Sequence, residues 1–365
     1  MTKLVPNWRW MRIYYYDRSK DRLLLDAIRP AILSVQHQFP DYRYYFQRDW
    51  HRGPNILIGS SLETGEHAAK DIVTRAINSY LKSHPSIENL SDAEYLRVTK
   101  GVSHWEAKTD YSHLPCRPNN MIFGEEPEPQ HHFLVQPELK QACWTFLAST
   151  TPYVLTWLNL SREGYLYRDT IAMTLMIMIV WLADPHLLRP YTSFVSHATG
   201  FLNSADTNTS IRTAFEVIYN GSQGGSVRSL IRETVHRLEH PMPETLPGEH
   251  SFKDLLAQTL HSIFQGLRSQ ELQPVDASAF FSGQVITPKN SGMIKTMNEC
   301  YEWRAWQITI SLFYQVLNQL GISAAERFLA CYLLGRGIED VYEHDHERII
   351  ETINTQPSAV FTFSR

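Results

Sequence analysis

The most constraining feature of this chain is a run of aromatic residues near its C-terminus, within residues 303–321. At the period of an α-helix, Trp303, Trp306, Ile310 and Tyr314 fall on one stripe. This spacing predicts a long helix with one aromatic face. The face has two interpretations: it belongs to a hydrophobic core, or it forms the wall of a site for a flat, apolar, heteroaromatic ligand.

The N-terminal part has the alternation that is typical of strands. Residues 8–17 and 42–60 are rich in Tyr, Ile and Trp, and residues 20–38 between them have helical spacing. A helix over residues 66–83 follows, and a His-Pro pair stops it. This order predicts a ferredoxin-like β-α-β start and an α+β fold class.

No Gly-, Ser- or Pro-rich linker divides the 365 residues, so we expect one continuous α+β body over residues 1–365. Residues 84–136 are rich in Pro, His, Asn and Glu, and we expect irregular strands there that line a groove. Residues 137–345 are expected to be mainly helical and to carry the aromatic helix. The expected helices lie at 137–158, 161–183, 209–220, 225–239, 251–269, 293–320 and 323–337, with a final strand at 357–364.

Charge and composition exclude several classes of protein. The formal net charge of -4 provides no basic field, so nucleic acid is not an expected ligand. Basic residues do crowd the first thirty positions, and we interpret them as a solvated face to which an acidic peptide could bind. These residues are Arg9, Arg12, Arg18, Lys20, Arg22 and Arg29.

Neither membrane nor metal patterns stand out. The most apolar run, residues 171–183, is shorter than the roughly 20 residues that cross a bilayer, so we expect a buried core helix. The start of the chain lacks the apolar core of a signal peptide. The cysteines form no CxxC pair and the histidines have no familiar ligand spacing, so we expect no disulfide, no metal site and a cytoplasmic protein.

The C-terminal helix resembles the end of the elimination domain of lantibiotic dehydratases, a family that includes stand-alone proteins of thiopeptide biosynthesis. In the eliminating enzymes the pattern reads His-Met-x-x-Asn-Arg-x-x-Gly. Here Asn318 matches the asparagine, which puts Tyr314 at the histidine and Gln319 at the arginine. The following Ser-Ala-Ala-Glu326-Arg327 is also similar to the family's continuation.

The N-terminus carries the second half of the resemblance. It is similar to the family's opening strand, helix and second strand, the last of which reads Gly-Pro-His-x-Arg-x-Arg in the eliminating enzymes. Here that histidine is Asn55, and the two arginines are Leu57 and Gly59. Arg48, just upstream, is kept.

These replacements imply a change of chemistry within the family. Eliminating glutamate needs a base for the Cα proton and cations for the developing charge. The resemblance therefore implies the pyridine synthase branch, which joins two dehydroalanines of a thiazole-containing ribosomal peptide by a formal [4+2] cycloaddition. Loss of water and of the leader peptide then gives a central pyridine in a macrocycle. No cofactor is implied, because each step is redox-neutral.

The candidate site residues follow from this resemblance and from their own chemistry. Tyr314 is the expected proton donor or shuttle. Glu106 follows an aromatic residue that would desolvate its carboxyl group, so we expect a partner in proton transfer. Ser282 is expected to orient a substrate amide. The expected substrate-binding residues are Trp303, Trp306, Gln319, Arg48 and Asn55.

Three alternatives remain open from the sequence. The chain could be a glutamate-elimination lyase with an altered site, a non-catalytic subunit that binds a leader peptide, or an inactive family member. The expected partner in each active case is a leader-bearing precursor peptide, docked on the β-α-β part within residues 1–83. The sequence leaves the oligomeric state open, including a homodimer.

Overall fold

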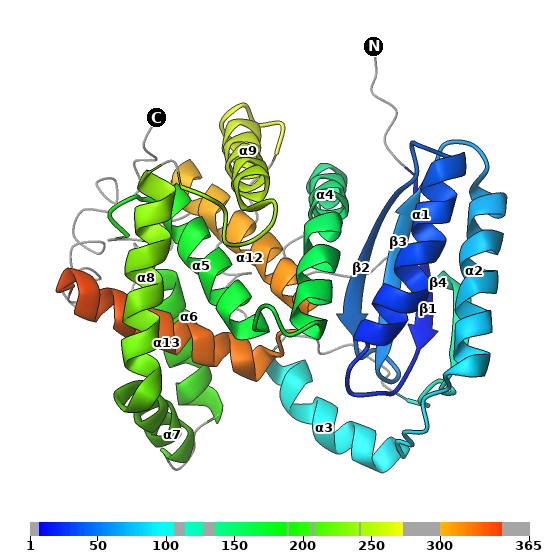
Figure 1. The fold of residues 1–365 in the computed structure, drawn as a ribbon, viewed down its shortest axis with the longest axis horizontal. Helices are drawn as coiled ribbons and strands as arrows, with labels where there is room; N and C mark the ends of the chain where they lie inside the picture. Colours follow the sequence, from blue (N-terminus) through cyan, green and yellow to red (C-terminus); the bar gives the residue numbers. More distant parts are fainter. Residues whose placement is uncertain are drawn as a thin grey trace. The chain divides into compact units, whose positions relative to one another are not determined.

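The computed structural model of the chain describes residues 7–105, 114–126, 136–187, 190–205, 209–240, 242–272 and 300–344 (Figure 1). The packing of Cα atoms groups the chain into two compact units. Unit 1 comprises Met1–Tyr165 and Asn318–Gly321, and unit 2 comprises Leu166–Leu317 and Ile322–Arg365.

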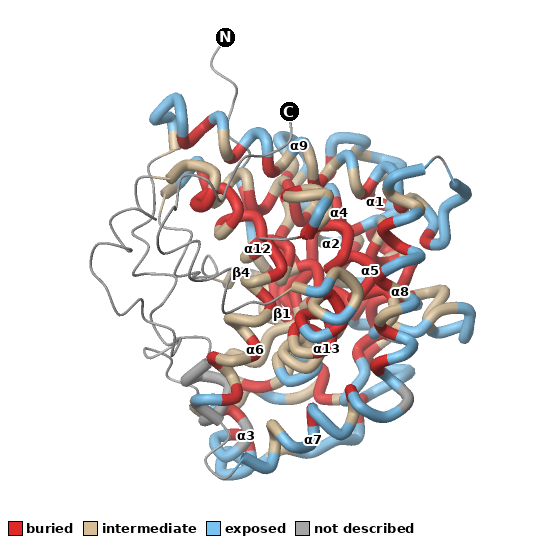
Figure 2. The backbone as a smooth tube through the Cα atoms, turned by 90° about the vertical axis from the view of Figure 1, so that its left-hand side faces the viewer, coloured by how far each residue is buried: buried red, intermediate tan, exposed pale blue. Residues whose placement is uncertain are grey.

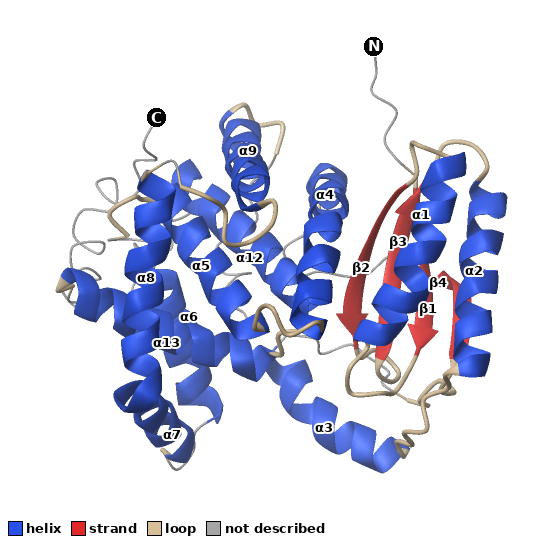
Figure 3. Ribbon diagram, in the orientation of Figure 1, coloured by secondary structure: helices blue, strands red, loops and turns tan. Residues whose placement is uncertain are grey.

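Unit 1 is built on a four-stranded antiparallel sheet with the strand order β2-β3-β1-β4 (Figure 3). Its strands are β1 (Trp8–Tyr14), β2 (Arg43–Asp49), β3 (Asn55–Ser61) and β4 (Met121–Glu126). Helical segments connect β1 to β2 and β3 to β4, which is the ferredoxin-like order. The α+β fold class expected from the sequence is therefore confirmed.

Helices cover both faces of this sheet. The first helix begins as a π-helical segment, Leu23–Ile28, and continues as α1 (Arg29–Gln38), which packs with α2 (Glu66–Ser83) (Figure 1). On the other face lies α4 (Pro137–Arg162), whose Trp144 contacts the rings of Trp8 and Trp10. The alternation of β1 explains this arrangement, because its even-numbered residues point to the α4 face.

Two stretches of unit 1 differ from the sequence expectation. The strand expected over residues 42–60 is a hairpin, because the turn between β2 and β3 reverses the chain at Gly53, whose φ is 118°. The segment 84–136 does contain the strand β4, but it also contains a helix, α3 (Asp92–Trp105). That helix starts at a capping box in which Ser91 and Glu94 exchange hydrogen bonds.

All the regular elements among the described residues of unit 2 are helices. Its helices are α5 (Arg168–Ala183), α6 (Thr192–Ala205), α7 (Ser210–Ile218), α8 (Gly224–Glu239), α9 (Glu249–Arg268), α12 (Tyr301–Leu320) up to Leu317, and α13 (Ala324–Tyr342). A π-helical segment, Tyr219–Gln223, joins α7 to α8. The helix α6 was not expected from the sequence, and the strand expected at 357–364 lies outside the described residues.

The core of unit 2 forms where α13 packs against α6 and α8. Two glycines of α13 allow the close approach, because a Cβ atom at Gly335 would lie 3.0 Å from Val195 and one at Gly337 would lie 2.7 Å from Ile231. The apolar run of α5 is almost entirely buried, as expected from the sequence, whereas α7 is largely exposed (Figure 2). Among the described helices, none has the length and apolar character needed to cross a membrane.

Candidate active site

The link between α12 and α13 sets the position of the residues around Tyr314. Gly321 adopts a φ of 83°, and the next N–H, from Ile322, donates to the carbonyl of Leu317 at 3.0 Å. A capping box between Ser323 and Glu326 then starts α13. The local sequence thus ends one helix and starts the next within three residues.

Four side chains of unit 2 form what we call the tyrosine cluster: Tyr314, His197, Arg327 and Cys331. The Tyr314 hydroxyl lies 2.6 Å from Nδ1 of His197, on α6, and 3.6 Å from Sγ of Cys331, on α13. The guanidinium carbon of Arg327 lies 4.7 Å from the centre of the Tyr314 ring, in a cation–π contact. Three helices therefore converge on one phenol.

The titration behaviour of this cluster follows from its burial. Burial raises the pKa of Tyr314 well above its ordinary value, and Arg327 opposes the shift only in part. Burial, with the nearby charge of Arg327, lowers the pKa of His197 to about 3, and burial raises the pKa of the Cys331 thiol to about 11. At neutral pH the phenol, the imidazole and the thiol are all uncharged beside one guanidinium.

The two predicted tryptophans of α12 lie in the core of unit 2. Trp303 and Trp306 are both buried, and the indole N–H of Trp306 donates to Oγ of Ser193 at 2.8 Å. This bond ties α12 to the first turn of α6, the helix that carries His197. In this structure the two indoles support the helices around Tyr314, and direct contact with a substrate stays a prediction.

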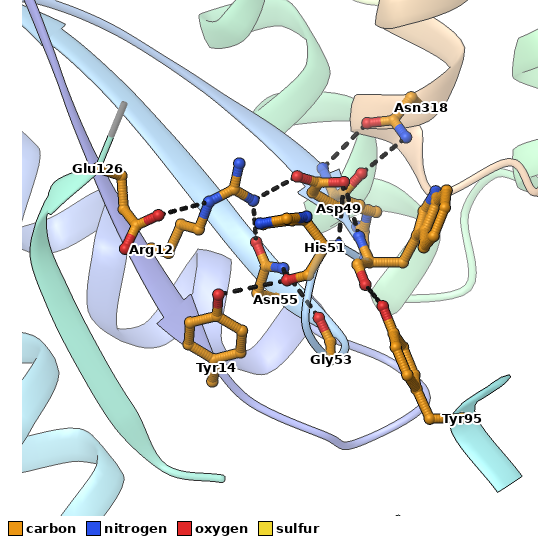
Figure 4. Close-up of polar contacts among 11 residues, drawn as sticks. Arg12, Tyr14, Asp49, His51, Gly53, Asn55, Tyr95, Glu126 and Asn318 are labelled. Atoms are coloured by element: carbon orange, nitrogen blue, oxygen red, sulfur yellow. Dashed lines mark hydrogen bonds and ion pairs between the residues drawn. The ribbon is translucent and has the colours of Figure 1, made fainter. Parts of the chain in front are cut away.

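Unit 1 contains a second group, which we call the arginine cluster: Arg12, Asp49, Asn55 and Glu126 (Figure 4). Arg12 is only 5% exposed, and its guanidinium pairs with Asp49, with Glu126 at 3.2 Å and with Oδ1 of Asn55 at 3.0 Å. Burial opposes the charge of Arg12, yet the two carboxylates raise its pKa overall. The cluster is an internally paired cation on the α4 face of the sheet.

Asn55 shapes the turn between β2 and β3. Its side-chain amide donates to the carbonyls of His51 at 3.1 Å and of Gly53 at 2.9 Å (Figure 4). Tyr95 of α3 donates to the carbonyl of Trp50 in the same turn. The residue at the family's histidine position therefore holds backbone groups here, and contact with substrate stays a prediction.

The end of α12 satisfies the outer edge of β2. The side-chain amide of Asn318 accepts a hydrogen bond from the N–H of Arg48 and donates one to the carbonyl of Arg48, both at 2.9 Å (Figure 4). The amide thus makes the two backbone hydrogen bonds that a neighbouring strand would make. Gln319 donates to the carbonyl of Phe46 at 2.8 Å and to Oγ1 of Thr151 at 3.0 Å. Without these bonds, the backbone N–H and carbonyl of Arg48 and the carbonyl of Phe46 would be unpaired at the edge of the sheet.

Arg48 has structural partners on the same edge. Its guanidinium pairs with Asp21 at 2.7 Å and donates to the Gln319 carbonyl at 3.1 Å. Burial lowers the pKa of Arg48 to about 10. Arg48 and Gln319 thus meet in unit 1, and their role as substrate ligands stays a prediction.

The structure divides the predicted site residues into groups. Tyr314, Trp303 and Trp306 belong to unit 2, whereas Arg48 and Asn55 belong to unit 1. Glu106 and Ser282 lie outside the described residues. Among the described residues, no group of three or more His, Cys, Asp or Glu side chains could hold a metal ion.

His197 and Arg12 were not predicted from the sequence as residues of a site. His197 lies on a helix that was not anticipated, and a lone histidine has no local signal. Arg12 was interpreted as part of a solvated basic face, which is wrong for Arg12 and for Lys20, since both are buried. The period-two alternation does contain a signal for Arg12, because it puts this charge on the same face as Trp8 and Trp10.

Comparison with known proteins places this chain in a family. The family model described as "Lantibiotic biosynthesis dehydratase C-term" matches residues 8–338, and the chain therefore belongs to this family. No curated protein has a significant sequence match to the chain.

Two solved structures cover nearly the whole chain. A structure described as "Pyridine synthase, TbtD, from thiomuracin biosynthesis" is similar with a TM-score of 0.71 and 25% identity, over 92% of this chain and 99% of that chain. The structure of TsrL is similar with a TM-score of 0.66 and 16% identity, over 95% of this chain and 98% of that chain. The second likeness supports the fold alone.

Proposed function

We propose that this chain is a pyridine synthase of thiopeptide biosynthesis. Its substrate is a leader-bearing ribosomal peptide that already carries thiazoles and two dehydroalanines. The enzyme joins the dehydroalanines by a formal [4+2] cycloaddition, and loss of water and of the leader as an amide then gives a pyridine. The observation that carries the proposal is the neutral, hydrogen-bonded phenol of Tyr314 at the family's base position.

Proton transfer is the chemical task for Tyr314. One backbone amide must tautomerise to its imidic acid, which turns the dehydroalanine into a 2-azadiene. A phenol can donate a proton to the amide oxygen and take one from the amide nitrogen, so that no net charge is left on the enzyme. Holding both alkenes in a near-attack geometry supplies roughly 7–11 kcal/mol, which reduces the need for fixed charges.

The same geometry argues against glutamate elimination. That reaction needs a base for a Cα proton, and a phenol whose pKa is raised by burial stays protonated at neutral pH. The family's two strand arginines are Leu57 and Gly59 here, and Leu57 is buried. Gln319, at the family's third arginine, is also buried and bonds to the backbone of β2.

The similarity to a pyridine synthase over nearly the full length of both chains supports the same conclusion. The proposed reaction is redox-neutral and requires no cofactor. Its partner is the precursor peptide, with the leader docked on unit 1 and the core peptide reaching Tyr314.

The experiment uses mass spectrometry of a synthetic peptide that carries a leader, thiazoles and two dehydroalanines. The enzyme is expected to convert it to a macrocycle that is lighter by water and by the excised leader amide. A peptide with alanine in place of one dehydroalanine is the matched control and should stay unchanged. If the enzyme leaves the first peptide intact and instead releases glutamate from a glutamylated peptide, the elimination lyase replaces this proposal.

A further inference from the structure

The contact between His197 and Tyr314 suggests a role for a residue that the family pattern does not include. His197 lies on α6, and its ring centre is 5.3 Å from that of Tyr314. The 2.6 Å separation of Nδ1 from the phenol oxygen is that of a hydrogen bond. Only Nδ1 makes this bond, so the contact depends on one particular atom of the ring.

An imidazole beside a phenol can act in two ways. It can take the phenol proton as a base and become imidazolium, or it can stay neutral and hold the oxygen. The groups that face this pair from the neighbouring helix α13 are Arg327 and Cys331. A cation on His197 would be buried and would lie close to the guanidinium of Arg327, and both effects lower the pKa of His197, to about 3.

We infer that His197 is a positioning residue for Tyr314, which as a neutral imidazole donates from Nδ1 to the phenol oxygen and so aims the O–H group at the substrate. This inference rests on the proposed function of Tyr314 as a proton shuttle. In the tautomerisation step, the Tyr314 O–H bond breaks as its proton moves to the amide oxygen. The amide N–H bond breaks as that proton moves to the phenol oxygen. His197 is unchanged at the end.

The inference is tested with a matched pair of variants, His197→Asn and His197→Gln. The side-chain nitrogen of asparagine occupies a position close to Nδ1, whereas that of glutamine extends toward Nε2. We expect kcat of the Asn variant to stay within about threefold of the parent and that of the Gln variant to fall more than tenfold, a barrier increase above about 1.4 kcal/mol. KM should change little in both, since leader binding lies elsewhere.

The pH profile tests whether His197 stays neutral in the working enzyme. If His197 stays neutral, kcat of the parent should show no histidine ionisation between about pH 5.5 and about pH 8.5. This range includes the ordinary histidine pKa of about 6.5. A histidine that ionises with an ordinary pKa predicts an inflection in that range that disappears in the Asn variant. Observation of such an inflection, or full activity of the Gln variant, would overturn the inference.

A spectroscopic measurement keeps this test independent of activity. With fluorotyrosine at position 314, the ¹⁹F resonance should be similar in the parent and in His197→Asn and should shift in His197→Gln, with unfolding temperatures showing that all three are folded. If the resonances behave in this way but the parent makes no macrocycle, the contact is retained and the proposed function fails. If the parent cyclises and the three resonances are identical, the positioning role fails alone.

Discussion

Tyr314 shows how burial decides what a side chain can do. A phenol has an ordinary pKa of about 10, so in water at neutral pH it is protonated and a poor base. Burial raises that pKa further, and the hydrogen bond with His197 of α6 holds the hydroxyl in one place. The result is a protonated, hydrogen-bonded phenol at the position where the eliminating relatives place a histidine, and we propose that it is the proton donor.

Replacing Tyr314 with phenylalanine should remove this donor and leave the ring. We expect turnover to fall by more than tenfold, while affinity for the leader peptide stays within about threefold, since a barrier increase of about 1.4 kcal/mol already gives tenfold. Single-turnover cyclisation measures the first quantity and calorimetry with the leader peptide measures the second. Unchanged turnover would remove Tyr314 from the mechanism.

Gly59 shows a steric reason for one departure from the family pattern. A Cβ atom at this position would lie 2.3 Å from the ring of Tyr45 on the neighbouring strand. The arginine of the eliminating pattern therefore cannot be restored here without displacing that ring. In this chain the ring of Tyr45 occupies the space that the Cβ atom of an arginine would need.

Changing Gly59 to alanine should destabilise the protein by about 1–3 kcal/mol, the usual cost of overpacking a core. Gly225→Ala is the matched control, because a Cβ atom there meets no atom within 4 Å and the residue lies in α8. The control should be neutral or stabilised by up to about 1 kcal/mol through helix propensity. Denaturant unfolding of both variants measures the difference, and equal stabilities would show that Tyr45 moves freely.

At the scale of elements, the two edges of the sheet in unit 1 differ. The edge of β2 is occupied where Asn318 and Gln319 bond to Arg48 and Phe46. The other edge strand is β4, which the sequence did not place in the β-α-β part. A leader peptide that adds a strand to this sheet is therefore expected at β4 and not at β2.

Photo-crosslinking tests this placement. A benzoylphenylalanine introduced for Met121, which begins β4 and is 45% exposed, should crosslink to the leader peptide. The same group introduced for Leu33, which is 55% exposed on α1, is the matched control and should not. Crosslinks of equal yield at both positions, or at Leu33 alone, would refute docking at β4.

At the scale of the whole molecule, the chain completes unit 1 with residues from far along the sequence. Four residues, Asn318–Gly321, belong to unit 1 although the first three are the last residues of α12, most of which is in unit 2. Their side chains supply bonds to the edge of β2, and the Gln319 carbonyl accepts from the buried guanidinium of Arg48. Unit 1 is therefore discontinuous in sequence because residues of this segment satisfy polar groups at the edge of β2.

A fragment of residues 1–165 should therefore fold poorly. It lacks the partners of Phe46 and Arg48, and a buried polar group without a partner costs about 1–3 kcal/mol. We expect a lower unfolding temperature than the parent and self-association through the exposed β2 edge. Light scattering and circular dichroism measure both, and a monomeric fragment with a cooperative, parent-like melt would contradict the expectation.

Local patterns in the sequence were sufficient for several elements and for the position of Tyr314. Alternation identified β1, helical spacing identified α2 at its observed bounds, and the apolar run of α5 indicated a buried helix. The position of Tyr314 in the aromatic helix was likewise evident, since spacing along a helix is a property of the sequence alone. These features depend on neighbours only a few residues apart.

The partners of those residues were decided by the tertiary structure. His197 and Tyr314 are 117 positions apart, and Arg48 and Asn318 are 270 apart, so no local period relates them. The burial of Arg12 depends on carboxylates from two other strands. Protonation state, side-chain partners and free space are set by whatever packs around a residue, and that is determined only when the distant segments of the chain come together.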